Sequence, residues 1–102
     1  MGIDDLLGED ELHELFFIWD DKNIEHIARH RVEVFEAEEA MLDGNRVKIN
    51  AHSGHLGLIG ATEEGRRLVV IYIKKINKKY RVITARDAEE EEKKLYRRRL
   101  GR

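Results

Sequence analysis

The chain has 102 residues, of which 41% are apolar and 39% are charged, so it can form one compact domain around one core. It has no cysteine, which excludes disulfide bonds, thiolate nucleophiles and cysteine zinc sites. No apolar run is long enough to span a bilayer, and the acidic start does not resemble a signal peptide. We therefore expect a cytoplasmic domain over residues 1–102, loose over 1–8, with its core in 15–99 and no membrane association.

The charges are divided unevenly along the chain. Residues 1–45 hold 14 acids and 3 bases, a balance of −11, whereas residues 46–102 hold 7 acids and 16 bases, a balance of +9. Such asymmetry indicates a polyanionic or oppositely charged partner. It fits equally well with glutamate-rich helices and lysine-tolerant strands whose charges are simply solvated.

The first half of the chain predicts a strand and two helices. A short apolar strand at 16–19 leads into a helix that an aspartate at 20 or 21 caps and that runs to about His30. After a break at 31–32, a second helix is expected over 33–42. Asp43, Gly44 and Asn45 should end it, with Gly44 as a left-handed cap residue.

The second half changes to the period of β-strands. Strands are expected over 46–51, 55–61, 67–74 and 80–85, and their short connections imply an antiparallel meander. A helix over 87–99 ends the chain. The predicted fold is α/β of the α+β type: an N-terminal strand and two helices packed on a mostly antiparallel four- to five-stranded sheet, with a C-terminal helix.

The first predicted helix carries an unusual row of polar side chains. Asn23, His26 and His30 fall within roughly 60° of one another around the helix axis. Ile24, Ile27 and Ala28 lie on the adjoining face, which we expect to dock on the sheet.

Several ordered motifs resemble those of the BrnT toxins of BrnT–BrnA toxin–antitoxin pairs. They are Trp19-Asp20, Asn23, His26 to His30 with Val32, Gly65 to Val70, Arg81 to Ala88, and finally Glu92 with Tyr96. The resemblance implies a RelE-like fold, a ribonuclease that blocks translation, and neutralisation by a BrnA-like antitoxin with a ribbon-helix-helix DNA-binding domain. The chain departs from the family pattern at Arg31, where glycine is usual, and at His55, where many relatives carry arginine.

The residues that match these motifs suit RNA cleavage without a metal or other cofactor. Histidine can serve as a general base or acid near neutral pH, and arginine binds phosphate oxygens in pairs. We predict His26 and His30 as the acid–base groups and Arg86 as the cation that stabilises charge on phosphorus. Further RNA contacts are expected from Lys22, Asn23, Arg67, Arg81 and Thr84. Thr84 and Arg86 share one face of the last strand, whereas Arg81 points the other way unless a bulge intervenes.

Other interpretations of these residues stay open at this point. Trp19 and Tyr80 or Tyr96 either stack on a base or pack in the core. The two histidines could also chelate zinc together with His52 and His55, although the His-Glu-x-x-His arrangement is missing. A catalytically silent module of the same fold, binding a protein or RNA, is the alternative function. We expect no direct binding of DNA by this chain alone, and the final helix offers a face for a homodimer.

Overall fold

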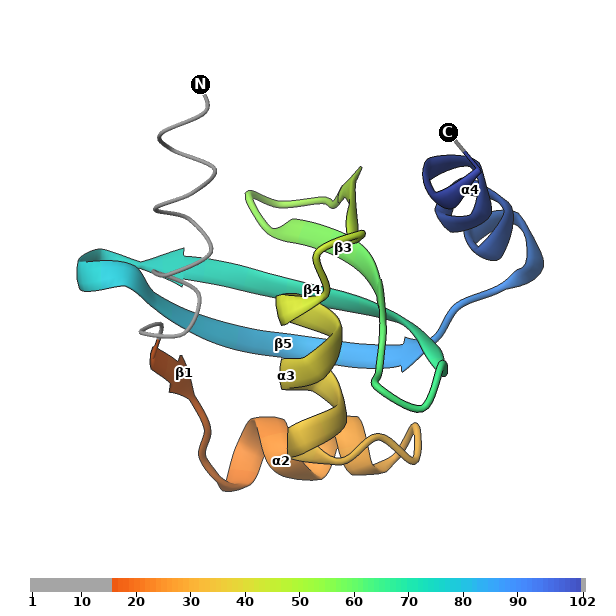
Figure 1. The fold of residues 1–102 in the computed structure, drawn as a ribbon. Helices are drawn as coiled ribbons and strands as arrows, with labels where there is room; N and C mark the ends of the chain where they lie inside the picture. The colour runs from red at the N-terminus through yellow and green to blue at the C-terminus, as the bar shows by residue number, and fades with distance from the viewer. Residues whose placement is uncertain (1–15, 102) are drawn as a thin grey trace.

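A five-stranded sheet organises the computed structural model, which describes residues 16–101. The predicted loose segment 1–8 lies outside these residues. In chain order the elements are β1 (Phe16–Ile18), α2 (Asp21–Ala28), α3 (Val34–Leu42), β2 (Val47–Asn50), β3 (Leu56–Ala61), β4 (Arg67–Lys75), a 3-10 turn (Ile76–Lys78), β5 (Lys79–Asp87) and α4 (Glu90–Leu100). The strand order is β1-β5-β4-β3-β2, and the helices lie on both faces (Figure 1).

The predicted antiparallel meander of β2, β3, β4 and β5 is confirmed, and β1 joins β5 in parallel. A β-bulge interrupts the pairing of β4 with β5. Ile71 is in register with Thr84 but Tyr72 with Val82, so Ile83 is one extra residue on β5. The bulge shifts the alternation of side chains along the rest of the strand.

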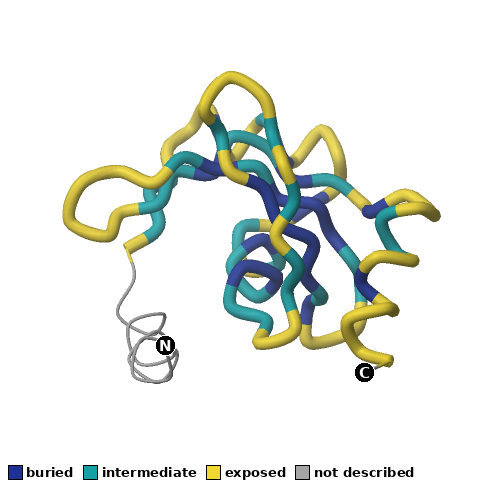
Figure 2. Tube along the Cα trace, turned by 90° about the horizontal axis from the view of Figure 1, so that it is seen from above, coloured by how far each residue is buried: buried dark blue, intermediate teal, exposed yellow. Residues whose placement is uncertain are grey.

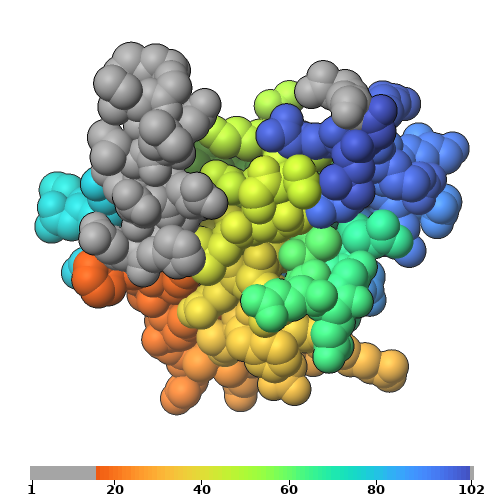
Figure 3. Space-filling view, in the orientation of Figure 1, coloured from red at the N-terminus to blue at the C-terminus, as the bar shows by residue number. Residues whose placement is uncertain are grey.

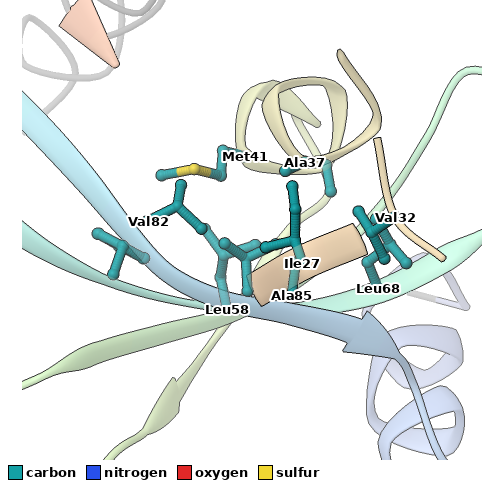
Figure 4. Packing of buried hydrophobic residues seen from close by; sticks show 11 residues of the cluster. Ile27, Val32, Ala37, Met41, Leu58, Leu68, Val82 and Ala85 are labelled. Atoms are coloured by element: carbon teal, nitrogen blue, oxygen red, sulfur yellow. The ribbon is translucent and has the colours of Figure 1, made fainter. Parts of the chain in front are cut away.

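The main core lies between α2, α3 and one face of the sheet (Figure 4). Ile27 of α2 and Ala37 of α3 are fully buried there against strand residues such as Val82. The expected docking of Ile24 and Ala28 is wrong, because both are exposed. Asn23 and Ile27, one turn apart, instead form a narrow inward stripe of α2.

A smaller core lies on the other face of the sheet. Ile59 and Val69 alternate along their strands with residues of the main core, so their side chains point to the opposite side. Tyr96 is the residue of α4 that joins them, together with Ala88 just before the helix. Figure 2 shows these buried segments at the centre and the exposed loops around them.

The connection between α2 and α3 turns sharply at Arg31, which has a left-handed backbone conformation with φ of 59°. The Arg31 N–H donates to the Ala28 carbonyl, and the Val32 N–H donates to the Ile27 carbonyl. This pair of hydrogen bonds forms a Schellman motif, whose left-handed position is usually glycine. The arginine that departs from the family pattern therefore occupies the position where glycine has a physical reason to be.

The end of α3 differs from the prediction, because Gly44 does not have a positive φ. The helix ends instead at Asp43, which is extended. The Asp43 carboxylate accepts hydrogen bonds from the N–H groups of Asn45 and Ala61 and from the Tyr96 hydroxyl. One aspartate thus ties α3 to β3 and to α4, which makes a left-handed glycine cap unnecessary.

Gly60 allows α3 to lie directly against β3. A Cβ atom at this position would stand 2.1 Å from the Ala40 carbonyl oxygen, whereas a Cβ at Gly44 would meet nothing within 4 Å. Because the obstacle at Gly60 is backbone, it cannot be relieved by a side-chain rotation.

We expect Gly60→Ala to lower the free energy of unfolding by roughly 1–3 kcal/mol, since the helix must move away from the strand. Chemical denaturation followed by circular dichroism measures the change. Gly44→Ala is the matched control and should stay close to the native chain. Equal effects of the two substitutions would contradict the close approach of α3 to β3.

We expect Arg31→Gly to stabilise the protein by about 0.5–1 kcal/mol. A left-handed conformation costs a non-glycine residue roughly 1–2 kcal/mol, and the extra freedom of glycine in the unfolded chain offsets about half of that gain. Arg31→Ala removes the same side chain but keeps the unfavourable conformation, so it should not stabilise. If both variants gained the same stability in denaturation experiments, the cause would be the arginine side chain and not the backbone.

Candidate active site

His26 of α2 and His30, which lies in the turn just after the helix ends at Ala28, are side by side. The centroids of the His26 and His30 rings are 5.9 Å apart and the rings are inclined by 56°. His30 is exposed and His26 is half-buried. The predicted row of imidazoles therefore exists on the surface of the described structure.

Asn23, the third member of that row, is only 4% exposed. Its amide donates to the carbonyl oxygens of Ile18 and Val82, and its side-chain oxygen accepts from the Asp20 N–H. These bonds use the whole polar group to join β1, the start of α2 and β5. Asn23 therefore serves the fold, and we do not retain it among the proposed RNA contacts.

Arg66, just before β4, holds the turn that follows the C-terminal end of α2. Its guanidinium donates to the carbonyl oxygens of His30 and Arg31, to the Glu36 carboxylate at 2.9 Å, and to the Asp87 carboxylate at 2.7 Å. Figure 3 shows the turn that carries it lying against the helices. The pKa of Arg66 is raised, chiefly by its hydrogen bond to Asp87, and the pKa of Asp87 is lowered by the same bond.

Arg86 lies on the face of the sheet opposite to the two histidines. It is in register with Val69 of the smaller core, and its guanidinium forms a two-point ion pair with Glu92 of α4 at 2.8 and 2.9 Å. The hydrogen bond to Glu92 raises the pKa of Arg86. The structure brings Arg86 to the same end of the sheet as His30, with Arg66 and Asp87 between them, but not into contact with the imidazoles.

Arg81 shows the effect of the bulge in β5. It is in register with Ile73, Thr84 with Ile71 and Arg86 with Val69, so all three belong to the same face of the sheet. The guanidinium of Arg81 binds the carboxylate of Asp20, the N-cap of α2, at 2.7 Å. Thr84 and Arg67 are half-buried, and Lys22 is exposed on the first turn of α2.

A model of one protein family, described as the ribonuclease toxin BrnT of type II toxin–antitoxin systems, matches residues 19–92. The chain belongs to the BrnT family. The resemblance predicted from the motifs is thereby confirmed, and membership implies an antitoxin partner. A search of curated proteins gave no match.

Arg66 is the site residue of this BrnT chain that sequence reasoning missed. It stood inside the Gly65 to Val70 motif, but we selected its neighbour Arg67 as an RNA contact. Arg66 lies in the Gly65 to Val70 motif and Asp87 in the Arg81 to Ala88 motif. No spacing rule pairs Arg66 with Asp87 across 21 residues. Their bond becomes predictable only once β4 and β5 are known to be neighbours.

The three aromatic residues considered for base stacking in this BrnT chain are engaged in packing. The Trp19 indole N–H donates to Glu38, and Tyr80 lies 5.7 Å from Tyr72 between ring centroids. Both pack against the main core. Tyr96 is buried, and its hydroxyl donates to Asp43; burial and this bond raise its pKa to about 12. The core interpretation accounts for all three.

Neither a zinc site nor a membrane span is found in residues 16–101. No group of three or more His, Asp or Glu side chains there is placed to hold a metal ion, so His52 and His55 do not complete a shell around His26 and His30. None of the helices in this range combines the length and the apolar character needed to cross a bilayer.

We expect the Asp20–Arg81 ion pair to stabilise the folded state only while the Asp20 carboxylate is ionised. The hydrogen bond from Arg81 lowers the pKa of Asp20 from 3.8 to about 2, so the ionised carboxylate is favoured in the folded state. Its contribution is present above pH 4 and is lost as the pH falls through about 2.

Asp20→Asn keeps an oxygen for capping but cannot titrate. The melting temperatures of the native chain and this variant should differ by a constant amount above pH 4 and converge by about pH 2. A difference that stays constant across this range would contradict the role of the charge.

Proposed function

We propose that this chain is a metal-independent endoribonuclease that acts on RNA in the cytoplasm and thereby inhibits translation. The observation that carries the proposal is the pair of adjacent imidazoles at the surface, His26 on α2 and His30 in the turn just after that helix. The family membership supplies the reaction class, and the chemistry of the two side chains fits it.

The proposed reaction begins with the 2′-hydroxyl of the substrate. One imidazole removes its proton, the 2′-oxygen forms a bond to phosphorus, and the bond from phosphorus to the 5′-oxygen breaks. The other imidazole gives a proton to that leaving oxygen. The products are a 2′,3′-cyclic phosphate and a free 5′-hydroxyl. Two imidazoles with centroids 5.9 Å apart are close enough to act on one phosphodiester.

We assign Arg86 to a phosphate of the substrate next to the scissile one, because Arg86 lies across the sheet from the imidazoles. Its side chain is 37% exposed, and Asp87 and Arg66 connect it to the carbonyl oxygen of His30. An RNA strand that crosses this end of the sheet meets the imidazoles on one face and Arg86 on the other. In this arrangement Glu92 must release Arg86 when the phosphate binds. Lys22, Arg67, Arg81 and Thr84 complete the proposed RNA contacts.

The antitoxin partner, in this proposal, carries a ribbon-helix-helix domain that supplies DNA binding, which we do not expect of this chain alone. Leu95 and Leu100 of α4 are 39% and 50% exposed and offer an apolar surface for association, including a homodimer. Light scattering after size exclusion, with and without the antitoxin, tests both associations.

The cleavage test compares two double variants in EDTA with a 20-nucleotide RNA. His26→Ala/His30→Ala should lower the cleavage rate by roughly 10²–10⁴-fold, the usual contribution of general acid–base groups. His52→Ala/His55→Ala removes two histidines from the connection between β2 and β3 and should leave the rate unchanged. Mass spectrometry of the products should find the 2′,3′-cyclic phosphate.

The result can contradict the proposal in two ways. RNA binding by the native chain without turnover would support the silent binding module instead. Equal loss of activity in the two double variants would place the chemistry elsewhere. Arg86→Ala and Glu92→Gln separate the roles of the ion pair: a phosphate contact requires the first to lose activity and the second to keep it, whereas a structural pair requires both to lose melting temperature and activity together.

A further inference from the structure

The β4–β5 hairpin is rich in positive charge, and part of that charge lies at its tip, far from the histidines. Residues 65–86 contain eight bases and no acid. Arg66, Arg81 and Arg86 have carboxylate partners in the structure. By contrast, within residues 16–101 no carboxylate forms an ion pair with Lys74, Lys75 or Lys79, and all three are exposed at the tip of the hairpin (Figure 2).

The geometry of the tip is unfavourable for the protein alone. Lys75 and Lys79 stand directly opposite each other across the two strands, and like charges in this arrangement repel. Asn77 and Lys78 both have positive φ, the conformation of a type I′ turn, where glycine is preferred at the second position. The facing lysines and the left-handed turn residues both cost folding free energy, and an anionic ligand would offset the repulsion between the lysines.

An exposed aromatic side chain lies beside Lys79 and on the same face of the sheet as Lys75, whereas Lys74 alternates to the other face. Phe16 of β1 is in register with Lys79 and is 65% exposed, and Ile76 at the apex is 81% exposed. Lysines interleaved with an aromatic ring are typical of surfaces that bind single-stranded nucleic acid, because the charges hold phosphates while a base stacks on the ring.

We propose that the hairpin tip, defined by Lys74, Lys75, Lys79 and Phe16, is a second binding site for single-stranded RNA. It lies at the opposite end of β4 and β5 from Arg66 and His30. Eight steps of about 3.3 Å separate Arg67 from Lys75, a distance of about 26 Å. At the stacked spacing of about 3.4 Å per nucleotide, an RNA needs about eight nucleotides to reach both sites. The hairpin tip therefore selects long RNAs.

The test measures the affinity for a fluorescein-labelled, unstructured 20-nucleotide RNA by anisotropy between 50 and 200 mM KCl. Lys74→Gln/Lys75→Gln/Lys79→Gln should weaken binding at least about tenfold at 50 mM and reduce the salt slope by about 2, or about 0.7 for each lost phosphate contact. Phe16→Leu should weaken binding several-fold and leave the salt slope unchanged, since stacking does not release counterions.

A charge-matched control is available on α4. Lys94→Gln/Arg98→Gln/Arg99→Gln also removes three exposed cations, which changes the net charge from −2 to −5 as the hairpin variant does. It should bind RNA as the native chain does. Equal losses in the two triple variants, or no loss in the hairpin variant, would overturn the inference, as would loss of binding to an acidic protein partner while RNA affinity stayed constant.

The length selection rests on the proposed function, and cleavage tests it separately. The hairpin variant should raise KM for the 20-nucleotide RNA several-fold and leave turnover of a 4-nucleotide RNA unchanged. A native chain that binds the long RNA through the hairpin but cleaves neither RNA would refute the proposed ribonuclease and leave the second site established. An equal effect of the variant on both lengths would refute the selection.

Discussion

The site depends above all on the guanidinium of Arg66. This one group binds carbonyl oxygens of the turn after α2, a carboxylate in the first turn of α3 and the carboxylate that ends β5. Arginine suits this position because its planar fork serves several acceptors while the charge stays fixed. Removing it would leave Glu36 and Asp87 without their cation and would release the turn after α2, which carries His30. The positions of the imidazoles therefore follow from an interaction that involves neither of them.

Asn23 plays the corresponding part at the start of α2. Its buried amide links β1 to β5 while its oxygen caps the helix, so the short edge strand and the helix are placed together. Anchored in this way at both ends, α2 needs only a narrow apolar stripe. This explains why Ile24 stays exposed and why the polar face of the helix faces solvent.

The element types, their order and the meander could be predicted because the periods of 3.6 and 2 residues and the turn residues were clear. The placement of side chains at the site was harder to predict. Whether Arg81 and Arg86 share a face depends on one extra residue, Ile83, which no periodicity reveals. Asn23 looked like a surface residue because the pattern of one helix does not show that a carbonyl of β5 lies above it. Arg86 directly precedes the predicted last helix in the sequence, yet the sequence does not show that its partner Glu92 places it across the sheet from the histidines.

Because the second core is small, α4 can detach from the sheet more easily than the rest of the fold unfolds. The polar contacts that hold this helix are the bond of Tyr96 to Asp43 and the ion pair of Arg86 with Glu92. Its apolar contact with the sheet is small. Segments with few buried contacts open locally without global unfolding. Each such opening also separates Glu92 from Arg86. The free energy that keeps α4 docked therefore sets the fraction of molecules in which the Arg86 guanidinium is not paired with Glu92, and a partner that binds α4 would change that fraction from the far face of the sheet.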